Sequence, residues 1–180
     1  MGHQVEYIKD DYRNISGRCN VFVSVGMLEH VGLANYQTLG GIIDRCLSAD
    51  GGGLIHSIAR NQPCPMNAWI ERRIFPGSYP PTLREMMQFF QPRGFSVLDV
   101  ENLRLHYAKT LEHWLTRFDA NQEKMRKWFD EDFVRACRLY LAGSLAGFTT
   151  GWLQLFQVVF ARPGLNDIAW TRDYLYAKSR

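Results

Sequence analysis

The sequence predicts an α/β protein in which a helical hairpin is inserted before the last strand. Two observations predict this fold class. Short runs rich in β-branched and aromatic residues alternate with segments of helical periodicity, which is typical of a sheet with parallel strands. Two longer amphipathic segments then follow one another before a final apolar run at 153–162. The chain of 180 residues, of which 46% are hydrophobic, is long enough to bury a core.

The first half predicts a strand–helix–strand unit. Residues 21–25 are typical of a short buried strand, residues 35–47 of an amphipathic helix, and residues 54–59 of a second buried strand. We interpret Asp50 and the glycines at 51–53 as the turn that leads into this second strand. They follow a helix and precede a strand, which is the reverse of a nucleotide-binding turn.

The second half predicts a further helix and strand, the hairpin and the last strand. We expect a helix at 81–91 that Pro92–Gly94 ends, an extended segment at 95–105, helices at 106–118 and 125–141, and a strand at 153–162. We expect residues 1–162 to form one domain, with the helical insertion at about 104–149, and residues 163–180 to form a polar tail.

Charge and cysteine content narrow the class of protein. A net charge of +3 is too weak to indicate a nucleic-acid partner, although it is compatible with an anionic surface. The four cysteines are widely scattered, so neither a zinc module nor a disulfide framework is indicated. This favours a protein of the reducing cytoplasm. No window approaches the ~20 apolar residues of a membrane span. We therefore expect a soluble protein, located in the cytoplasm or peripherally at the inner face of the membrane.

Several sequence segments occur together in a specific order and spacing. They read VFVSVGMLEHVG, GGGLIHSIA, WIERRIFPGSYPPTLREM, HYAKTLEHWLTRF, YLAGSLAGF and LQLFQVVFAR. Together they closely resemble the C-terminal half of the cyclopropane-fatty-acyl-phospholipid synthases, from about Val5 to Arg162. Mycolic acid cyclopropane synthases and methyltransferases are the related branch of that family.

The resemblance implies a partial S-adenosylmethionine-dependent methyltransferase fold, which is Rossmann-like, with the first two strands missing. The activity implied is transfer of a methyl or methylene group from S-adenosylmethionine to the double bond of an unsaturated phospholipid acyl chain. The segment VEYIKD, residues 5–10, corresponds to the family's third strand. With two strands missing, residues 21–26 would form an exposed apolar sheet edge, which invites self-association or pairing with a missing N-terminal half.

The resemblance also assigns site residues. Glu29, His56, the main chain of Ile58 and Tyr140 match the groups that hold a bound bicarbonate, the base that removes the proton which closes the ring. Asp11, with Tyr12 beside it, matches a segment near the adenine of S-adenosylmethionine, and His30 is expected to orient its loop. The family's Gly-rich loop and ribose-binding acid have no counterpart in this sequence, so we expect the isolated chain to bind S-adenosylmethionine poorly and to be inactive.

The chemistry is consistent with these residue types, but each has a structural alternative. A methylated alkene is a carbocation, which needs a dry apolar pocket, aromatic faces and a weak base. Glu29 alone would more often be a loop cap, His56 a core histidine and Tyr140 a packing residue. The arginine pair Arg72–Arg73 and the basic residues Lys124, Arg126 and Lys127 are typical of a solvated surface. Contact with lipid headgroups is the alternative.

Two other functions remain open from sequence alone. The chain could belong to a methyltransferase that acts on another lipid or small molecule. It could also be a non-catalytic remnant that binds lipid or another protein.

Overall fold

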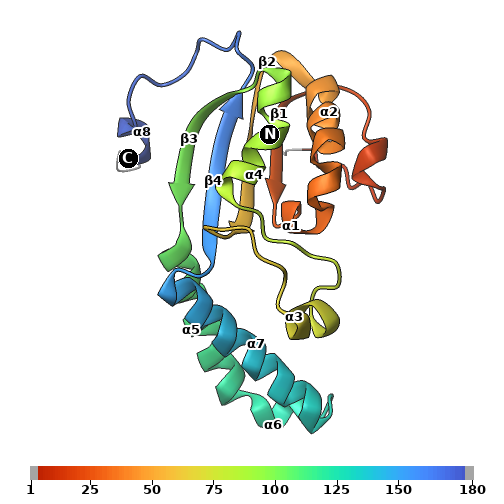
Figure 1. Ribbon diagram of the computed structural model, residues 1–180, viewed down its shortest axis with the longest axis vertical. Coiled ribbons are helices and arrows are strands. Elements are labelled where there is room, and N and C mark those ends of the chain that lie inside the picture. Colours follow the sequence, from red (N-terminus) through yellow and green to blue (C-terminus); the bar gives the residue numbers. More distant parts are fainter. Residues whose placement is uncertain (1–3, 177–180) are drawn as a thin grey trace.

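A mixed four-stranded sheet forms the centre of the molecule in the computed structural model, which describes residues 4–176 (Figure 1). The strand order is β1-β2-β4-β3, with bounds β1 Cys19–Val25, β2 Leu47–Ala59, β3 Ser96–Asn102 and β4 Gln154–Ala161. The predicted parallel pairing is confirmed for β1 and β2, whereas β4 runs antiparallel to both β2 and β3. The reason is that a hairpin of two helices returns the chain to the end of the sheet that it left.

The remaining elements are short helices around the sheet and the long hairpin. In chain order they are η1 Tyr12–Asn14, α1 Leu28–Val31, η2 Leu33–Asn35, α2 Tyr36–Cys46, α3 Ala68–Arg73, α4 Leu83–Met86, η3 Met87–Phe89, η4 Gln91–Arg93, α5 Arg104–Ala120, α6 Gln122–Met125, α7 Glu131–Thr150 and α8 Asp173–Tyr176.

One face of the sheet is closed by α2, α4 and the 3₁₀ turns that follow α4 (Figure 1). Ile55 of β2 and Val158 of β4 lie opposite each other on this face and are fully buried. Phe160 packs there between Phe90 and Phe95, with ring centroids 4.9 and 5.3 Å away. This apolar layer is the main core, and it fixes the ends of β1 and β2.

The hairpin forms a second, smaller core with the end of β4. Helices α5 and α7 pack along each other, and Ala108, Leu111, Leu141, Phe148 and Leu155 are the buried residues between them and the sheet. The hairpin projects away from the sheet (Figure 1). At its base the Arg104 guanidinium donates to the carbonyls of Phe148 and Thr149, at 2.6 and 2.9 Å, which ties the start of α5 to the end of α7.

The prediction of a glycine turn at 50–53 is wrong, because β2 begins at Leu47 directly after α2 and runs through all three glycines. A Cβ atom on Gly53 would lie 2.5 Å from the Phe22 carbonyl oxygen and 2.6 Å from Cζ of Phe160. A Cβ on Gly51 would lie 2.6 Å from Cγ of Leu47. The glycines therefore allow close approach of neighbouring strands, a use of glycine that resembles a turn signal in sequence.

The segment VEYIKD does not form the expected third strand. Residues 4–9 have no regular structure, and Tyr7 and Ile8 are exposed. A strand needs a neighbour for its backbone N–H and C=O groups, and no described strand lies beyond β1 on that edge.

Two predicted helices have different bounds: the first is shorter than its periodicity indicated, and the second begins later and continues to Thr150. The helix expected at 81–91 is α4 followed by 3₁₀ turns. Pro92 has no N–H to donate to the carbonyl of Gln88, and its ring would clash with that carbonyl in an α-helix. The Gln88 carbonyl instead accepts from the side-chain amide of Gln37 at 2.7 Å. The helix expected at 125–141 begins at Glu131, because the Asp130 side chain caps it by accepting from the Phe133 amide. The earlier segment ends at Pro92–Gly94 as predicted, and Gly94 adopts a left-handed conformation there.

None of the helices in residues 4–176 is both long and apolar enough to cross a membrane. The domain boundary at residue 162 stays a prediction.

Candidate active site

A cavity of about 650 Å³ lies where the ends of β1 and β2 meet α3 and the hairpin. Its wall is mostly apolar and aromatic, which is typical of a site for a hydrophobic ligand. The lining residues come from four regions: Gly26, Glu29 and His30 after β1; Ile58 and Arg60 at the end of β2; Met66, Asn67, Trp69, Ile70, Phe75, Ser78 and Pro80 around α3; and Tyr107, Leu139, Tyr140, Gly143, Ser144, Gly147, Phe148, Trp152 and Leu153 from the hairpin and the turn after it.

Glu29 is a buried carboxyl at the base of this cavity. Gly26 ends β1 with a φ of 64°, and the chain then turns into α1, which carries Glu29 back toward β2. Oε1 accepts from the backbone N–H of Ile58 at 2.5 Å. The side chain is only 6% exposed, and Oε2 is buried with no hydrogen-bond partner. A buried carboxylate oxygen without a partner is costly, so Oε2 is an acceptor ready for a ligand hydrogen.

Ile58 lies in the cavity wall as expected, but its main chain is not free to hold an anion. Its N–H is the donor to Glu29, so the backbone of β2 positions the carboxyl. The role that the structure gives to Ile58 is therefore to orient Glu29 and to supply apolar wall.

His56 lies two residues earlier on β2 and is not among the cavity-lining residues. With the Gln157 amide nitrogen as donor, its Nδ1 accepts at 3.1 Å, which leaves the proton of the neutral ring on Nε2. Burial lowers the pKa of His56, and the Glu29 carboxyl opposes that shift only in part. His56 therefore lies outside the cavity that Glu29 lines, and burial favours its uncharged form.

Tyr140 reaches the cavity from the middle of α7, as predicted. Its ring lies edge-on to Phe75, with centroids 5.8 Å apart, and burial raises its pKa. His30 also lines the cavity and contacts the same phenylalanine edge-on at 5.5 Å. Phe75 therefore connects the loop after β1 with the hairpin. The expectation that His30 orients its loop stays a prediction, and its exposed imidazole is available to the cavity.

Arg60 is a cavity residue that the sequence did not single out. Its side chain is 6% exposed, Nη1 donates to the carbonyls of Cys64 and Pro65 at 2.7 and 3.0 Å, and Nε is buried without a partner. Among the described ion pairs, none involves Arg60. A buried guanidinium without an acid attracts anions. An arginine at the end of an apolar strand was the only available signal.

The aromatic wall was also missed by sequence reasoning. Trp69, Phe75, Tyr107, Phe148 and Trp152 surround the cavity from three separate segments. Their helical spacing predicted packing for some of them, but only the path of the loop at 61–82 brings the rest to the same place.

The family model for mycolic acid cyclopropane synthetase matches residues 1–158 of the sequence. The chain belongs to the mycolic acid cyclopropane synthetase family. A probable fatty acid methyltransferase of Pseudomonas putida is 37% identical over 177 residues, covering 92% of this chain and 45% of the relative. The cyclopropane-fatty-acyl-phospholipid synthase of Escherichia coli K12 is 35% identical over 168 residues, covering 93% and 44%.

A solved mycolic acid cyclopropane synthase, CmaA1 in complex with SAH and CTAB, superposes with a TM-score of 0.77 at 27% identity, covering 83% of this chain and 57% of that one. The fold of this cyclopropane synthetase family member is thus part of an S-adenosylmethionine-dependent methyltransferase fold, and the family is one of enzymes. The chain spans slightly less than half the length of the two curated relatives.

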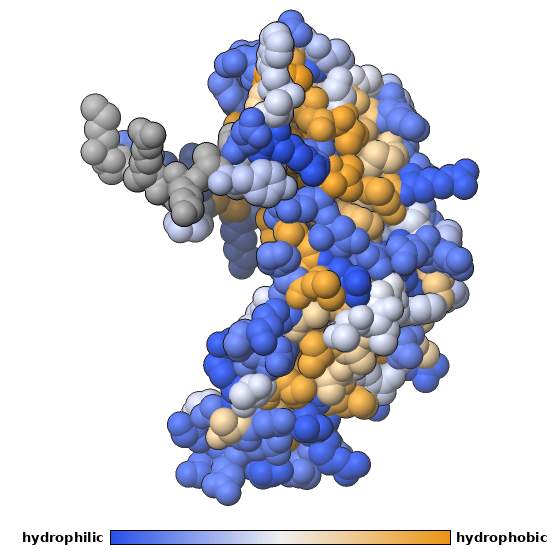
Figure 2. Space-filling model, turned by 90° about the vertical axis from the view of Figure 1, so that its left-hand side faces the viewer, coloured by the Kyte–Doolittle hydropathy of each residue, from blue (hydrophilic) through white to orange (hydrophobic). Residues whose placement is uncertain are grey.

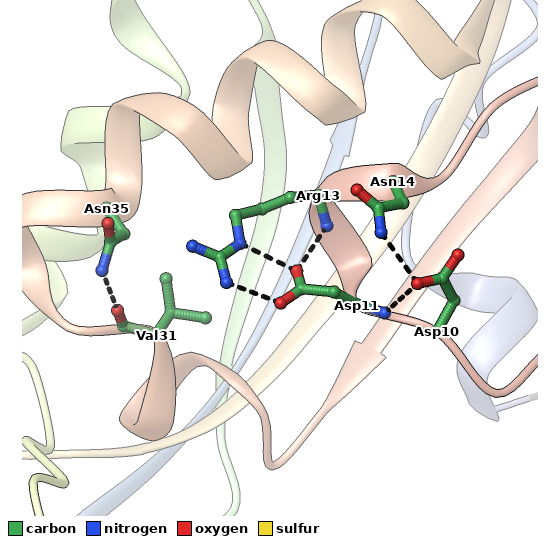
Figure 3. Close-up of polar contacts among 6 residues, drawn as sticks. All are labelled: Asp10, Asp11, Arg13, Asn14, Val31 and Asn35. Carbon is green, nitrogen blue, oxygen red and sulfur yellow. Dashed lines mark hydrogen bonds and ion pairs between the residues drawn. The ribbon is translucent and has the colours of Figure 1, made fainter.

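The two expected cofactor residues lie apart from the large cavity. Figure 3 shows the Asp11 carboxylate turned toward Arg13, which donates from its backbone and from two guanidinium nitrogens at 2.6–2.9 Å. These hydrogen bonds lower the pKa of Asp11 to about 2. Tyr12 lines a separate cavity of about 240 Å³ beside β1. The local ion pair already occupies Asp11, so its part in cofactor binding stays a prediction.

The described residues do not form a metal site. Within residues 4–176 no group of three or more His, Cys, Asp or Glu side chains is placed to hold a metal ion. Cys19, Cys46, Cys64 and Cys137 are free thiols.

Proposed function

We propose that this chain supplies the acyl-chain pocket of an S-adenosylmethionine-dependent methyltransferase that adds a methylene group to the double bond of an unsaturated phospholipid chain. The observation that supports it most is the large apolar cavity with the unpartnered Oε2 of Glu29 at its base. A long hydrocarbon needs an apolar wall, and the reaction needs one polar group placed within it.

Bicarbonate fits the polar groups of this cavity. The free oxygen of Glu29 would accept its hydroxyl hydrogen, the Tyr140 hydroxyl would donate to it, and Arg60 would balance its negative charge. Arg60 is the one lysine or arginine among the described residues that line the cavity. When bound, bicarbonate supplies a weak base that takes the proton released on ring closure. His56 does not line the cavity, so the contact with this anion that the resemblance implies stays a prediction.

The aromatic wall would stabilise positive charge on the substrate. Tyr107, Phe75 and Phe148 all line the cavity, so a reacting acyl chain there would lie against their rings. A cation over an aromatic face is stabilised by about 0.5–2 kcal/mol, and more effectively where it is desolvated. An acyl chain that fills the cavity would keep water away from the cation.

The cofactor would be held largely by residues outside this chain. Tyr12 offers an aromatic wall beside β1, while the carboxylate of Asp11 is engaged by Arg13. The relatives are about twice as long, so the activity belongs to a protein that includes their N-terminal part.

The test is a fusion of this chain to the part of the Escherichia coli relative that precedes the matched region. Incubated with S-adenosylmethionine and phospholipid bearing one double bond per chain, the fusion is expected to add one methylene, detected by mass spectrometry. The matched control is the fusion with Tyr140→Phe and Glu29→Gln together. Transfer to a non-lipid acceptor instead would identify a different methyltransferase, and a folded fusion that binds lipid without any transfer would identify a lipid-binding remnant.

A further inference from the structure

The large cavity opens to the surface beside the hairpin. Leu139 of α7 and Trp152, just after α7, both line it, yet they are 59% and 61% exposed. Large apolar side chains with this exposure are the outer part of the same wall. The apolar lining therefore continues from the interior onto the surface.

Two arginines follow the cavity-lining residues of α3. In α3, Trp69 and Ile70 line the cavity, and Arg72 and Arg73 follow at helical spacings of three and four residues, on the same side one turn later. Phe75, two residues beyond, lines the cavity again. Both arginines are exposed, and neither has a hydrogen-bond or ion-pair partner among the contacts within residues 4–176.

The end of α3 carries an excess of positive charge. Glu71 precedes the two arginines and is also exposed, so the three residues together carry a net single positive charge. Neither guanidinium is committed to a neighbouring acid, whereas Arg126 is paired with Glu131 at the far end of the hairpin.

We propose that this opening, formed by Arg72, Arg73, Leu139 and Trp152, is the surface that docks on a phospholipid bilayer, with the two arginines on lipid phosphates. The proposal rests on the proposed function, because a phospholipid that delivers one acyl chain to the cavity keeps its headgroup outside. The headgroup then lies at the rim. Arginine matches phosphate oxygens with two parallel N–H donors, and tryptophan favours the water–lipid boundary.

A competing surface exists at the far end of the hairpin. Trp128 is 74% exposed there, Phe129 and Phe133 stack with centroids 4.2 Å apart, and Lys124 and Lys127 lie nearby in sequence. Figure 2 shows hydrophilic residues gathered at this end, whereas apolar surface lies nearer the sheet. Residues of this end do not line the large cavity, so a lipid bound there would not deliver its chain to Glu29.

The experiment is co-sedimentation of the 180-residue chain with vesicles of dioleoyl phosphatidylglycerol and dioleoyl phosphatidylcholine in equal parts. We expect the double variant Arg72→Gln and Arg73→Gln to lower the partition coefficient about 10-fold or more, since each basic residue near an anionic membrane contributes ~1 kcal/mol. Trp152→Ser is expected to lower it as well. Matched controls are Lys124→Gln with Lys127→Gln, and Trp170→Ser in the C-terminal segment, where the ring is fully exposed; both are expected to leave binding unchanged.

Circular dichroism and thermal melting establish that each variant is folded, and the single variants Arg72→Gln and Arg73→Gln provide the same comparison with smaller changes. No binding of the unaltered chain, or an equal loss from the lysine control, overturns the proposal; the second result places the lipid surface at the hairpin end. The fusion described above separates the two proposals when it is given a dispersed short-chain unsaturated phospholipid. Transfer without vesicle docking overturns only the docking surface, and vesicle docking without transfer overturns only the function.

Discussion

The two faces of the sheet differ in what covers them. On one face Ile55, Val158 and Phe160 are 0–1% exposed beneath the helices. On the other, Val21, Val23 and Val25 of β1 alternate with the buried side chains and remain 61–65% exposed.

The second face is also where the site lies. Ile58, which holds Glu29, points to this side together with Leu155 and the hairpin, and His56 pairs across it with Gln157. The hairpin covers one end of this face, where the cavity lies. The exposed valines of β1 occupy the other end. The difference teaches that one face of the sheet provides the stability of the fold and the other provides its surfaces for ligands and partners.

The largest effect is expected on the covered face. Phe160→Ala should lower the free energy of unfolding by about 3–5 kcal/mol, because it removes a fully buried ring from the core. Val23→Ala, at an exposed position of the other face, should change it by less than ~0.5 kcal/mol. Urea unfolding measures both. A cost for Val23→Ala near that of Phe160→Ala would mean that both faces are packed, and the comparison would fail.

Glu29→Gln should act on turnover rather than on folding. In the fusion protein, the amide keeps the approximate volume of the carboxyl but replaces one acceptor oxygen by a donor, so the rate should fall ~100-fold. Added bicarbonate is expected to restore part of it, and replacements of His56 and Tyr140 should behave alike if all three hold one anion.

The readout for Glu29→Gln is turnover per folded molecule beside the melting temperature. A lower melting temperature with normal turnover would identify Glu29 as a structural loop residue, and the anion would have to be placed elsewhere.

Self-association is the next effect expected. β1 is an edge strand whose outer valines are exposed, so the isolated chain should dimerise through it, and Val23→Lys should weaken the dimer several-fold. Sedimentation velocity over a range of concentrations measures it. A monomer at all concentrations would mean that other residues cover this edge.

The smallest effect concerns pH. His56 has a pKa lowered by burial below its ordinary 6.5, so the unfolded chain binds a proton more readily than the folded one as pH falls. Stability should therefore decline below about pH 6.5 and continue to decline down to the lowered pKa. His56→Asn should flatten this part of the curve, and stability curves from pH 5 to 8 compare the two. An unchanged slope would assign the decline to other groups.

Sequence reasoning found the elements whose signals are local. The apolar runs of β1 and β2 and the helical spacing of the hairpin predicted their types, but the burial expected for residues 21–25 is wrong, because β1 is an edge strand and Val21, Val23 and Val25 are exposed. Glu29, Ile58 and Tyr140, which the resemblance singled out, all line one cavity. Arg60 and the aromatic wall around α3 were missed, because their convergence depends on a loop whose path is set by contacts with distant residues, such as the Tyr79 amide donating to the Glu29 carbonyl.

The errors have physical causes of the same kind. Glycines in β2 give the local signal of a turn, although the neighbouring strands require their lack of a side chain. The cap at Asp130 overrides an apolar period that would otherwise continue through Trp128. The docking surface and the bicarbonate contacts stay proposals, since they involve molecules outside the chain.

Gly53 extends the influence of the sheet to the chemistry. Any side chain there would displace the Phe22 carbonyl or the Phe160 ring, and thus widen the gap between β1 and β2. Glu29 lies just after the end of β1, and its Oε1 accepts from the Ile58 N–H of β2 at 2.5 Å. The position of the carboxyl therefore depends on the distance between the two strands. A methyl group added to Gly53 would therefore shift the Glu29 carboxyl without touching it, so the residue with no side chain sets the position of the one acid that, within residues 4–176, lines the large cavity.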